Sequence, residues 1–228
     1  MLNGWRHELY PAYAPRGELI FEIERSAAAL FGLVSYGVHM TAYVNSPQHG
    51  LHIWTPSRSK TKSTYPGMLD NTVAGGIPSG YTAFDTLVKE SAEEASFPED
   101  LVKTRAKCTG AISYFYIRSE KAGGESGLLQ PEVQYCYDLD LTEPWDGKDV
   151  TPRPCDDEVE AFQLLSVGEV KKSLAEGRFK PNCGLVILVS SLSPRHGHIF
   201  FFLADDVDRI SSSGIISSHP RMNRTILN

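Results

Sequence analysis

Long apolar runs and an excess of basic charge are both missing from this chain of 228 residues. No run approaches the ~18 to 20 apolar residues that a helix needs to cross a bilayer. The N-terminal segment MLNGWRHELY lacks the basic region and apolar stretch of a signal peptide. The net charge of -6 gives no basic footprint for polymeric nucleic acid. We therefore expect a soluble, cytoplasmic protein without a membrane or nucleic-acid partner, with an organelle left open.

Cysteine is sparse, and its spacing signals neither a zinc site nor a redox motif. The four cysteines lie far apart, without a C-x-x-C pair and without a matching histidine pair: Cys108, Cys136, Cys155 and Cys183. We expect free thiols, as is usual in a reducing compartment.

The composition is nevertheless that of a folded protein. Hydrophobic residues make up 41% of the chain and charged residues 22%, which is too apolar for a disordered chain. The chain is also a little long for one compact domain. We predict an N-terminal hairpin extension over residues 1–32, a main domain over 33–199 and an irregular tail over 200–228.

Strand and helix patterns alternate irregularly along the chain. The turn at Pro15, Arg16 and Gly17 predicts a β-hairpin over residues 8–25. Helices are predicted from Thr82 and over residues 167–176, where Gly177 ends the pattern. Further strands are predicted over residues 37–44, 51–55, 111–118, 132–141 and 158–165, with a short extended segment at 71–74. This mixture indicates an α/β protein without the regular alternation of a doubly wound sheet.

The helix that begins near Thr82 has an apolar face and an acidic face. A capping-box-like pair, Thr82 and Asp85, marks its start. The positions expected to be buried are Phe84, Leu87, Val88, Ser91, Ala92 and Ala95. On the other side, Glu90, Glu93 and Glu94 fall within an arc of roughly 100°.

Three carboxylates on one arc repel one another, and the C-terminal half of a helix further disfavours negative charge. A divalent cation would reverse both effects, and Mg²⁺ binds a few carboxylates together with substrate phosphates. The simpler interpretation is a solvated acidic face in which Lys89 pairs with Glu93. Gly75, Gly76 and Gly80 favour the cation, because glycine backbone and helix N–H groups can approach a phosphate closely.

The segment AGGIPSGYTAFDTLVKESAEEASF resembles the Nudix box, G-x5-E-x7-R-E-U-x-E-E-x-G-U, where U is a bulky aliphatic residue. Gly75 matches the first glycine, Glu90 the glutamate after the arginine, and Glu93 and Glu94 the paired glutamates. Five positions depart from the pattern: Tyr81 replaces the first glutamate, Lys89 the arginine, Ser91 an aliphatic residue, Ser96 the glycine and Phe97 the last aliphatic residue.

Further similarity comes from six segments between Trp5 and Ile199: WRHELYPAY, YGVHMTAYV, YPGMLDNTVAGGIPSG, EVQYCYDLDL, DDEVEAFQLL and FKPNCGLV. Together they resemble the Nudix branch that is fused or related to thiamine pyrophosphokinase. In that branch a lysine at position 89 and a residue other than glutamate at position 81 are normal. The resemblance implies a Nudix-like α/β/α sandwich with a mixed sheet.

The resemblance also implies a mechanism. Glu90, Glu93 and Glu94 would hold Mg²⁺, or alternatively Mn²⁺, which neutralises a diphosphate and activates the attacking water. Lys89 would orient the carboxylates. A box glutamate or an outside acid would take the proton from water, and Glu158 ranks slightly ahead of Glu160 because it begins its predicted strand.

Candidate substrate contacts lie in three places. Gly75 and Gly76 offer close backbone approach, and the loop before them offers cations for phosphate: Arg58, Lys60 and Lys62. Aromatic groups for a flat ring are Tyr36, His39, Trp54, Tyr65 and Tyr114, each of which is more often a core residue.

Three functions are compatible with these patterns. The resemblance favours hydrolysis of the diphosphate of thiamine diphosphate, or of its oxidised analogues, to the monophosphate and phosphate. A phosphatase for oxidised nucleoside diphosphates would use the same diphosphate group and another flat heterocycle. The third interpretation is a truncated, non-catalytic ligand-binding domain. The partner is in each case a small molecule, and the sequence leaves the oligomeric state open.

Overall fold

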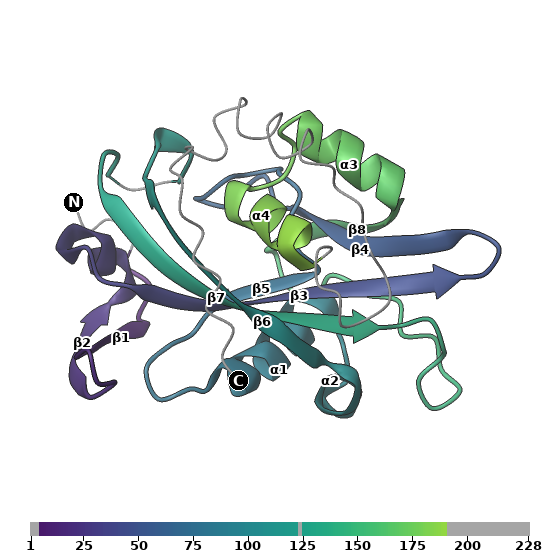
Figure 1. The fold of residues 1–228 in the computed structure, drawn as a ribbon, viewed down its shortest axis with the longest axis horizontal. Helices are drawn as coiled ribbons and strands as arrows, with labels where there is room; N and C mark the ends of the chain where they lie inside the picture. Colours follow the sequence, from purple (N-terminus) through teal and green to yellow (C-terminus); the bar gives the residue numbers. More distant parts are fainter. Residues whose placement is uncertain (1–4, 123–124, 191–228) are drawn as a thin grey trace.

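The computed structural model describes residues 5–122 and 125–190. A six-stranded mixed sheet forms its centre, in the order β6-β7-β3-β4-β8, with β5 paired to β3 (Figure 1). Its strands are β3 (Ser35–Ser46), β4 (Gly50–Arg58), β5 (Val73–Gly76), β6 (Lys107–Ile117), β7 (Leu129–Asp140) and β8 (Val159–Ser166). The pairing of β3 with β7 is parallel, and the other pairings in this sheet are antiparallel.

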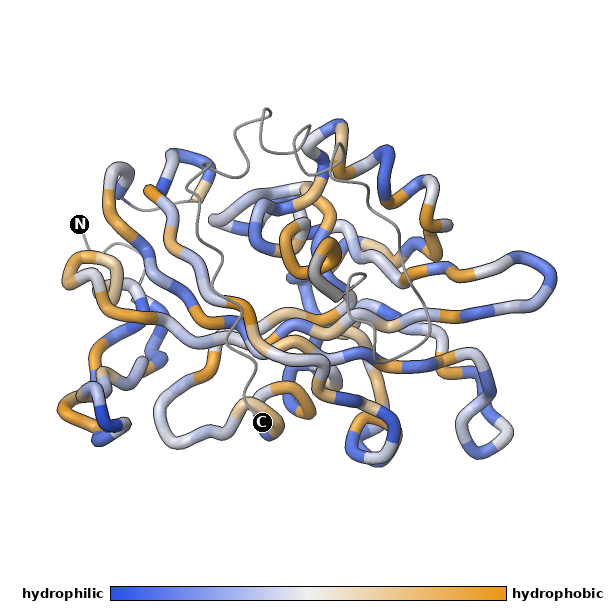
Figure 2. Tube along the Cα trace, in the orientation of Figure 1, coloured by the Kyte–Doolittle hydropathy of each residue, from blue (hydrophilic) through white to orange (hydrophobic). Residues whose placement is uncertain are grey.

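Helices cover both faces of the sheet. Helices α1 (Ala83–Ala95) and α2 (Glu99–Arg105) lie on one face, and α3 (Val167–Ala175) and α4 (Pro181–Ser190) lie on the other (Figure 1). Val38 and Met40 of β3 pack with Leu87 of α1, whereas Ile53 of β4 packs with Val170 of α3. Hydrophobic residues follow the strands between the two layers, and α4 is hydrophobic over most of its length (Figure 2). This is the predicted α/β/α sandwich.

The N-terminal hairpin is a separate two-stranded sheet of β1 (Leu9–Tyr13) and β2 (Leu19–Glu24). A 3-10 helix, η1 (Arg25–Phe31), follows and leads into β3, and a second one, η2 (Glu120–Ala122), follows β6. The predicted hairpin is therefore confirmed, and it lies at one end of the sandwich (Figure 1).

Two helices have no counterpart in the sequence-based prediction. Helix α2 spans only 7 residues, about two turns, and its two buried residues, Leu101 and Val102, are adjacent, so no apolar position recurs one turn later. Helix α4 has the sequence PNCGLVILVS, which is apolar on all sides, so it carries no amphipathic pattern.

No helix among the described residues is long and apolar enough to span a membrane. The predicted tail, residues 200–228, lies outside the described residues.

Candidate functional site

Two strands diverge beside β3, and the candidate site lies between them. Strand β4 pairs with β3 at residues 43–46, whereas β5 pairs with β3 at residues 37–40. Beyond its pairing with β3, β4 continues alongside β8. The loop of residues 59–72 connects β4 to β5, and Glu158 directly precedes β8. The chain thus brings three distant segments to the same space.

Helix α1 places its acidic face next to β5. Thr82 caps the helix by accepting a hydrogen bond from the backbone N–H of Asp85 at 3.1 Å. The opposite face, which includes Leu87, Val88 and Ala95, is buried. Glu90 and Glu94 lie one turn apart and both face β5, whereas the Glu93 side chain is half exposed.

Glu90 and Glu94 each contact the backbone of β5. Gly75 leaves room for Glu90, because a Cβ atom at position 75 would collide with the Glu90 carboxyl group. The Glu94 Oε2 accepts a hydrogen bond from the Ala74 N–H at 2.9 Å. The first box glycine therefore makes space for a carboxylate of the same box.

A pocket joins Glu94 to Glu158. Its lining comes from β4, the following loop, α1 and the start of β8: Pro56, Arg58, Lys62, Asp70, Asn71, Glu94, Glu158 and Val159. Glu158 forms an ion pair with Lys62. Asn71 Nδ2 is buried and has no hydrogen-bond partner within the described ranges. The pocket therefore combines three carboxylates, those of Asp70, Glu94 and Glu158, with an amide donor that has no partner among the described residues.

Burial and mutual repulsion raise the pKa values of two carboxyl groups on α1, those of Glu90 and Glu94. Burial raises the pKa of Glu94 well above its usual range, and the nearby charges of Glu90, Asp70 and Glu158 raise it further. The pKa of Glu90 is also raised by burial. Burial would raise the pKa of Glu158 too, but the hydrogen bond and charge of Lys62, with the charges of Arg58 and Arg25, lower it. Glu158 is thus held as an anion beside two carboxyls that favour a proton.

The structure separates the remaining predicted catalytic residues from this pocket. Lys89 binds Glu93 at 2.7 Å and lies 3.6 Å from Glu90, so it connects two of the box glutamates. Glu160 is exposed and pairs with Lys60 at 3.6 Å. Neither Glu160 nor Lys60 lines the pocket.

The predicted substrate contacts lie in varied environments. Arg58 is buried and binds Asp70 at 2.6 Å, and it also donates to the Thr64 carbonyl at 2.9 Å, so it holds its own loop in place. The Tyr36 ring packs edge-on against Tyr13 of the hairpin, with centroids 5.8 Å apart. A Cβ atom at Gly76 would collide with the Tyr10 hydroxyl, so this glycine receives a side chain from the hairpin.

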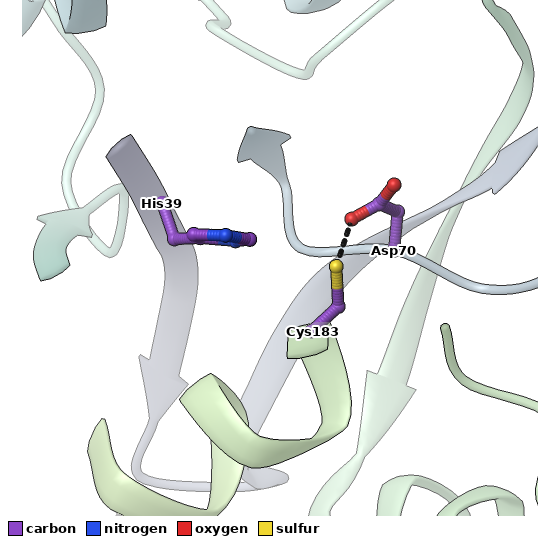
Figure 3. Close-up of side chains that lie close together, drawn as sticks. All are labelled: His39, Asp70 and Cys183. Carbon is purple, nitrogen blue, oxygen red and sulfur yellow. Dashed lines mark hydrogen bonds between the residues drawn. The ribbon is translucent and has the colours of Figure 1, made fainter. Parts of the chain in front are cut away.

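His39 belongs to a buried cluster behind the pocket. Its Nδ1 lies 2.8 Å from Asn71 Oδ1, and the Cys183 thiol donates to Asp70 Oδ1 at 2.5 Å (Figure 3). Candidate ligand atoms of His39, Asp70 and Cys183 lie within 4.8 Å of one another, a spacing that a metal ion could use.

The charges around His39, Asp70 and Cys183 indicate that this cluster is an internal polar network and not a metal site. Burial lowers the pKa of His39 to about 4 and raises that of Cys183 well above its usual range, so both are neutral. Burial alone would raise the pKa of Asp70, but the Lys180 and Arg58 charges hold it below its usual range. A divalent ion would add charge to a site that already contains two cations.

Sequence reasoning missed four residues around the site. Asp70 and Asn71 line the pocket, but in the sequence they read only as the end of a polar loop. Tyr10 and Arg25 approach from the hairpin. No local sequence pattern relates Tyr10 or Arg25 to α1, because their proximity to the box depends on tertiary packing.

Comparisons with known proteins agree with this geometry. The NUDIX domain family model matches residues 36–183. Nudix hydrolase 20, chloroplastic, from Arabidopsis thaliana is 38% identical over 224 residues, covering 97% of this chain and 53% of the relative. An uncharacterized Saccharomyces cerevisiae protein is 39% identical over 203 residues, covering 87% of this chain and 57% of the relative.

A solved structure from Deinococcus radiodurans has a TM-score of 0.55 at 21% identity, covering 79% of this chain and 98% of that one, and supports the fold. The sandwich and its acidic helix therefore define a Nudix-type domain, and the chain belongs to the Nudix family. It spans about half the length of the curated relatives that it matches. The names of these relatives do not mention thiamine.

Proposed function

We propose that this chain is a metal-dependent hydrolase that cleaves the diphosphate bond of a small organic substrate. The observation that carries the proposal is the convergence of α1 and the start of β8 on one pocket, where Glu94 faces the same space as Glu158. Glu90 lies one turn before Glu94 and completes a group of three carboxylates.

The carboxylates fit a divalent cation bound through oxygen. Glu90 and Glu94 are partly buried next to like charges, and burial favours their protonated forms. A cation bound by Glu90, Glu94 and the more exposed Glu93 would remove that repulsion. Mg²⁺ is the first candidate and Mn²⁺ the second. When bound, such an ion neutralises phosphate oxygens and lowers the pKa of a water.

The remaining groups then have distinct roles. Glu158 is held ionised by Lys62, so its carboxylate can accept the proton of the attacking water. Glu160 is a weaker candidate for this role because it does not line the pocket. Lys89 orients Glu93 and Glu90. Asn71 Nδ2 is available as a donor to a phosphate oxygen.

For the substrate we propose thiamine diphosphate or its oxidised analogues, on the basis of the sequence resemblance. Tyr36 and His39 are among the aromatic residues predicted to contact the ring, but His39 is buried in its cluster. Of the predicted phosphate contacts, Lys62 lines the pocket, where it pairs with Glu158, and Lys60 does not line it. Oxidised nucleoside diphosphates are the alternative. A fold neighbour from Francisella tularensis is named as a bifunctional NMN adenylyltransferase/ADP ribose pyrophosphatase complexed with AMP and a manganese ion. It has a TM-score of 0.50 at 15% identity, and the match covers 71% of this chain and 42% of that one.

A substrate panel tests the proposal. Phosphate release should be measured with thiamine diphosphate, its oxidised analogues and oxidised nucleoside diphosphates, in Mg²⁺, in Mn²⁺ and in excess chelator. We expect release from at least one diphosphate in Mg²⁺, and loss of that release in chelator. Glu99→Gln is the matched control for Glu93→Gln. Each glutamate pairs with a lysine four residues away, but Glu99 lies on α2, outside the box. Full turnover in chelator, or none with any diphosphate, would contradict the proposal. The cytoplasmic location stays a prediction.

A further inference from the structure

The N-terminal hairpin contacts the loops on both sides of the site. The backbone N–H of Ser79, in the loop before α1, donates to the Leu9 carbonyl at 2.8 Å. The Tyr10 hydroxyl occupies the space above Gly76. Arg6 donates from Nη2 to Ser63 Oγ at 2.7 Å, in the loop between β4 and β5. The hairpin precedes the residues that the family model matches, 36–183, yet it is attached to the site at two places.

Arg25 follows β2 directly and is held by two residues of the hairpin. Its guanidinium lies over the Tyr10 ring, 5.4 Å from the centroid, and Nη1 binds Glu8 Oε2 at 2.7 Å. Its side chain is nevertheless 44% exposed. A guanidinium has five N–H donors, so a bond at Nη1 leaves capacity for a further anion.

The Arg25 charge acts on the carboxylates of the site. It is one of the charges that hold the pKa of Glu158 below its usual range, and Glu90 in turn favours the charged form of Arg25. The geometry agrees, because the guanidinium lies over the ring of Tyr10, whose hydroxyl meets β5 next to the residue that leaves room for Glu90. Tyr10, which supports it, rests on the box backbone at Gly76.

We propose that Arg25 is a substrate-binding residue that contacts the diphosphate group of the substrate, and that the hairpin serves to present it. This inference rests on the proposed function, because it takes the diphosphate to lie at Glu90, Glu94 and Glu158. A diphosphate that enters a group of carboxylates needs cationic contacts besides the metal, and the planar fork of arginine suits two phosphate oxygens.

Three other cations around the site are already engaged with carboxylates. Lys89 pairs with Glu93 and Glu90, Arg58 with Asp70, and Lys62 with Glu158. Arg58 is also buried and fixed by carbonyls of its loop. Arg25 differs because its partner, Glu8, lies on the hairpin itself, so substrate binding need not disturb a carboxylate of the site.

Two measurements on the full chain test the proposal. The first is binding of inorganic pyrophosphate in Mg²⁺ by calorimetry. The second is kcat and KM for the diphosphate that the wild-type protein hydrolyses fastest. Arg25→Ala should weaken pyrophosphate binding and raise KM by about 10-fold to 100-fold, the effect of losing a charge-assisted hydrogen bond, while kcat changes much less. Arg25→Lys should recover part of the affinity.

Arg16→Ala is the matched control, because Arg16 is an exposed cation in the turn of the same hairpin, and it should leave both measurements unchanged. Glu8→Gln separates binding from hairpin stability. If Arg25 only secures the hairpin through Glu8, Glu8→Gln should reproduce the losses of Arg25→Ala, and both should lower the melting temperature. Under the proposal, Glu8→Gln binds pyrophosphate at least as tightly as wild type.

The two proposals fail in different ways. If no diphosphate is hydrolysed by the wild-type protein, the proposed function is wrong, and pyrophosphate binding still decides the role of Arg25. If the wild-type protein hydrolyses a diphosphate and Arg25→Ala keeps wild-type KM and pyrophosphate affinity, the inference on Arg25 alone is wrong. Wild-type protein that does not bind pyrophosphate in Mg²⁺ also overturns it.

Discussion

Glu93 and Glu94 are neighbours in the sequence but lie in different environments. Glu93 pairs with Lys89 at 2.7 Å with its side chain half exposed. Glu94 turns toward β5, accepts the Ala74 N–H and lines the pocket. A helical wheel assigns both to one acidic arc, because an arc of roughly 100° does not show which of its edges meets the sheet.

This difference predicts opposite stability effects for two otherwise equivalent variants. Glu94→Gln removes a charge that burial disfavours, so the metal-free protein should gain stability by about 0.5 kcal/mol or more, the size of a like-charge helical pair. Glu93→Gln loses its ion pair with Lys89 and should be neutral or slightly less stable. Glu94→Gln should also reduce turnover by about 10²-fold or more. Melts in chelator and turnover in Mg²⁺ measure both effects.

Equal melting temperatures for the two variants, or normal turnover of Glu94→Gln, would contradict this assignment and leave the acidic patch as a solvated surface.

The sequence predicted the acidic residues but only part of their surroundings. Glu90, Glu93 and Glu94 share a short helical repeat, and a repeat is visible in sequence. Asp70, Asn71 and Arg25 meet the carboxylates only through the divergence of β4 from β5 and the placement of the hairpin. Such contacts depend on tertiary packing, which leaves no local periodic signal.

Strand β5 is short, and each of its two glycines leaves room for a different side chain. Gly75 gives space to the Glu90 carboxyl, whereas Gly76 gives space to the Tyr10 hydroxyl of the hairpin. Neighbouring residues of β5 therefore contact a carboxylate of α1 and the tyrosine that supports Arg25.

Alanine at each position should therefore give a different defect. Gly75→Ala should displace the Glu90 side chain, whose Cγ and Cδ would both collide with the added Cβ, and weaken Mg²⁺ binding by about 10-fold, the lower range for disturbed metal ligation. Gly76→Ala should displace Tyr10 and thus Arg25, which raises KM while Mg²⁺ affinity stays near wild type. Calorimetric titration with Mg²⁺ and steady-state kinetics distinguish the two. Identical profiles for both variants would show that β5 has no such division.

The helices and strands that could be predicted from the sequence are those with distinct apolar and polar faces or with a clear turn between them. The helix at α1 and the hairpin were predicted because an apolar and a polar face alternate, or because a turn separates two extended runs. Helix α4 was not, because it is apolar on all sides and lies against the sheet beside the buried Phe179 and Val170. Its role depends on burial by other elements, and the sequence of α4 alone does not record that burial.

At the scale of the whole molecule, one polar network joins the sheet to the helical layer opposite α1. His39 belongs to β3, Asp70 and Asn71 precede β5, and Cys183 belongs to α4. Its stability depends on an uncharged imidazole, since burial and the Lys180 charge lower the pKa of His39 to about 4. The fold should therefore respond to pH through this network.

In the unfolded chain, histidine titrates near pH 6.5. Between about pH 6.5 and 4 the unfolded state gains a proton that folded His39 does not accept, so stability falls as pH decreases through this window. The full difference is roughly 3 kcal/mol at pH 4, an order-of-magnitude value for so buried a group. The low pKa of Asp70 acts separately, because its contribution is lost only below about pH 4.

Urea unfolding at pH 7 and at pH 5 measures this dependence, in wild type and in His39→Gln. Glu90 and Glu94 have raised pKa values and act in the opposite direction, but both proteins contain them, so the difference between the two proteins isolates His39. We expect wild type to lose more stability than His39→Gln on acidification. His49→Gln, at an exposed histidine in the turn between β3 and β4, should keep the wild-type pH response. Equal losses in wild type and His39→Gln would show that His39 accepts its proton without unfolding, and that the cluster tolerates a charged imidazole.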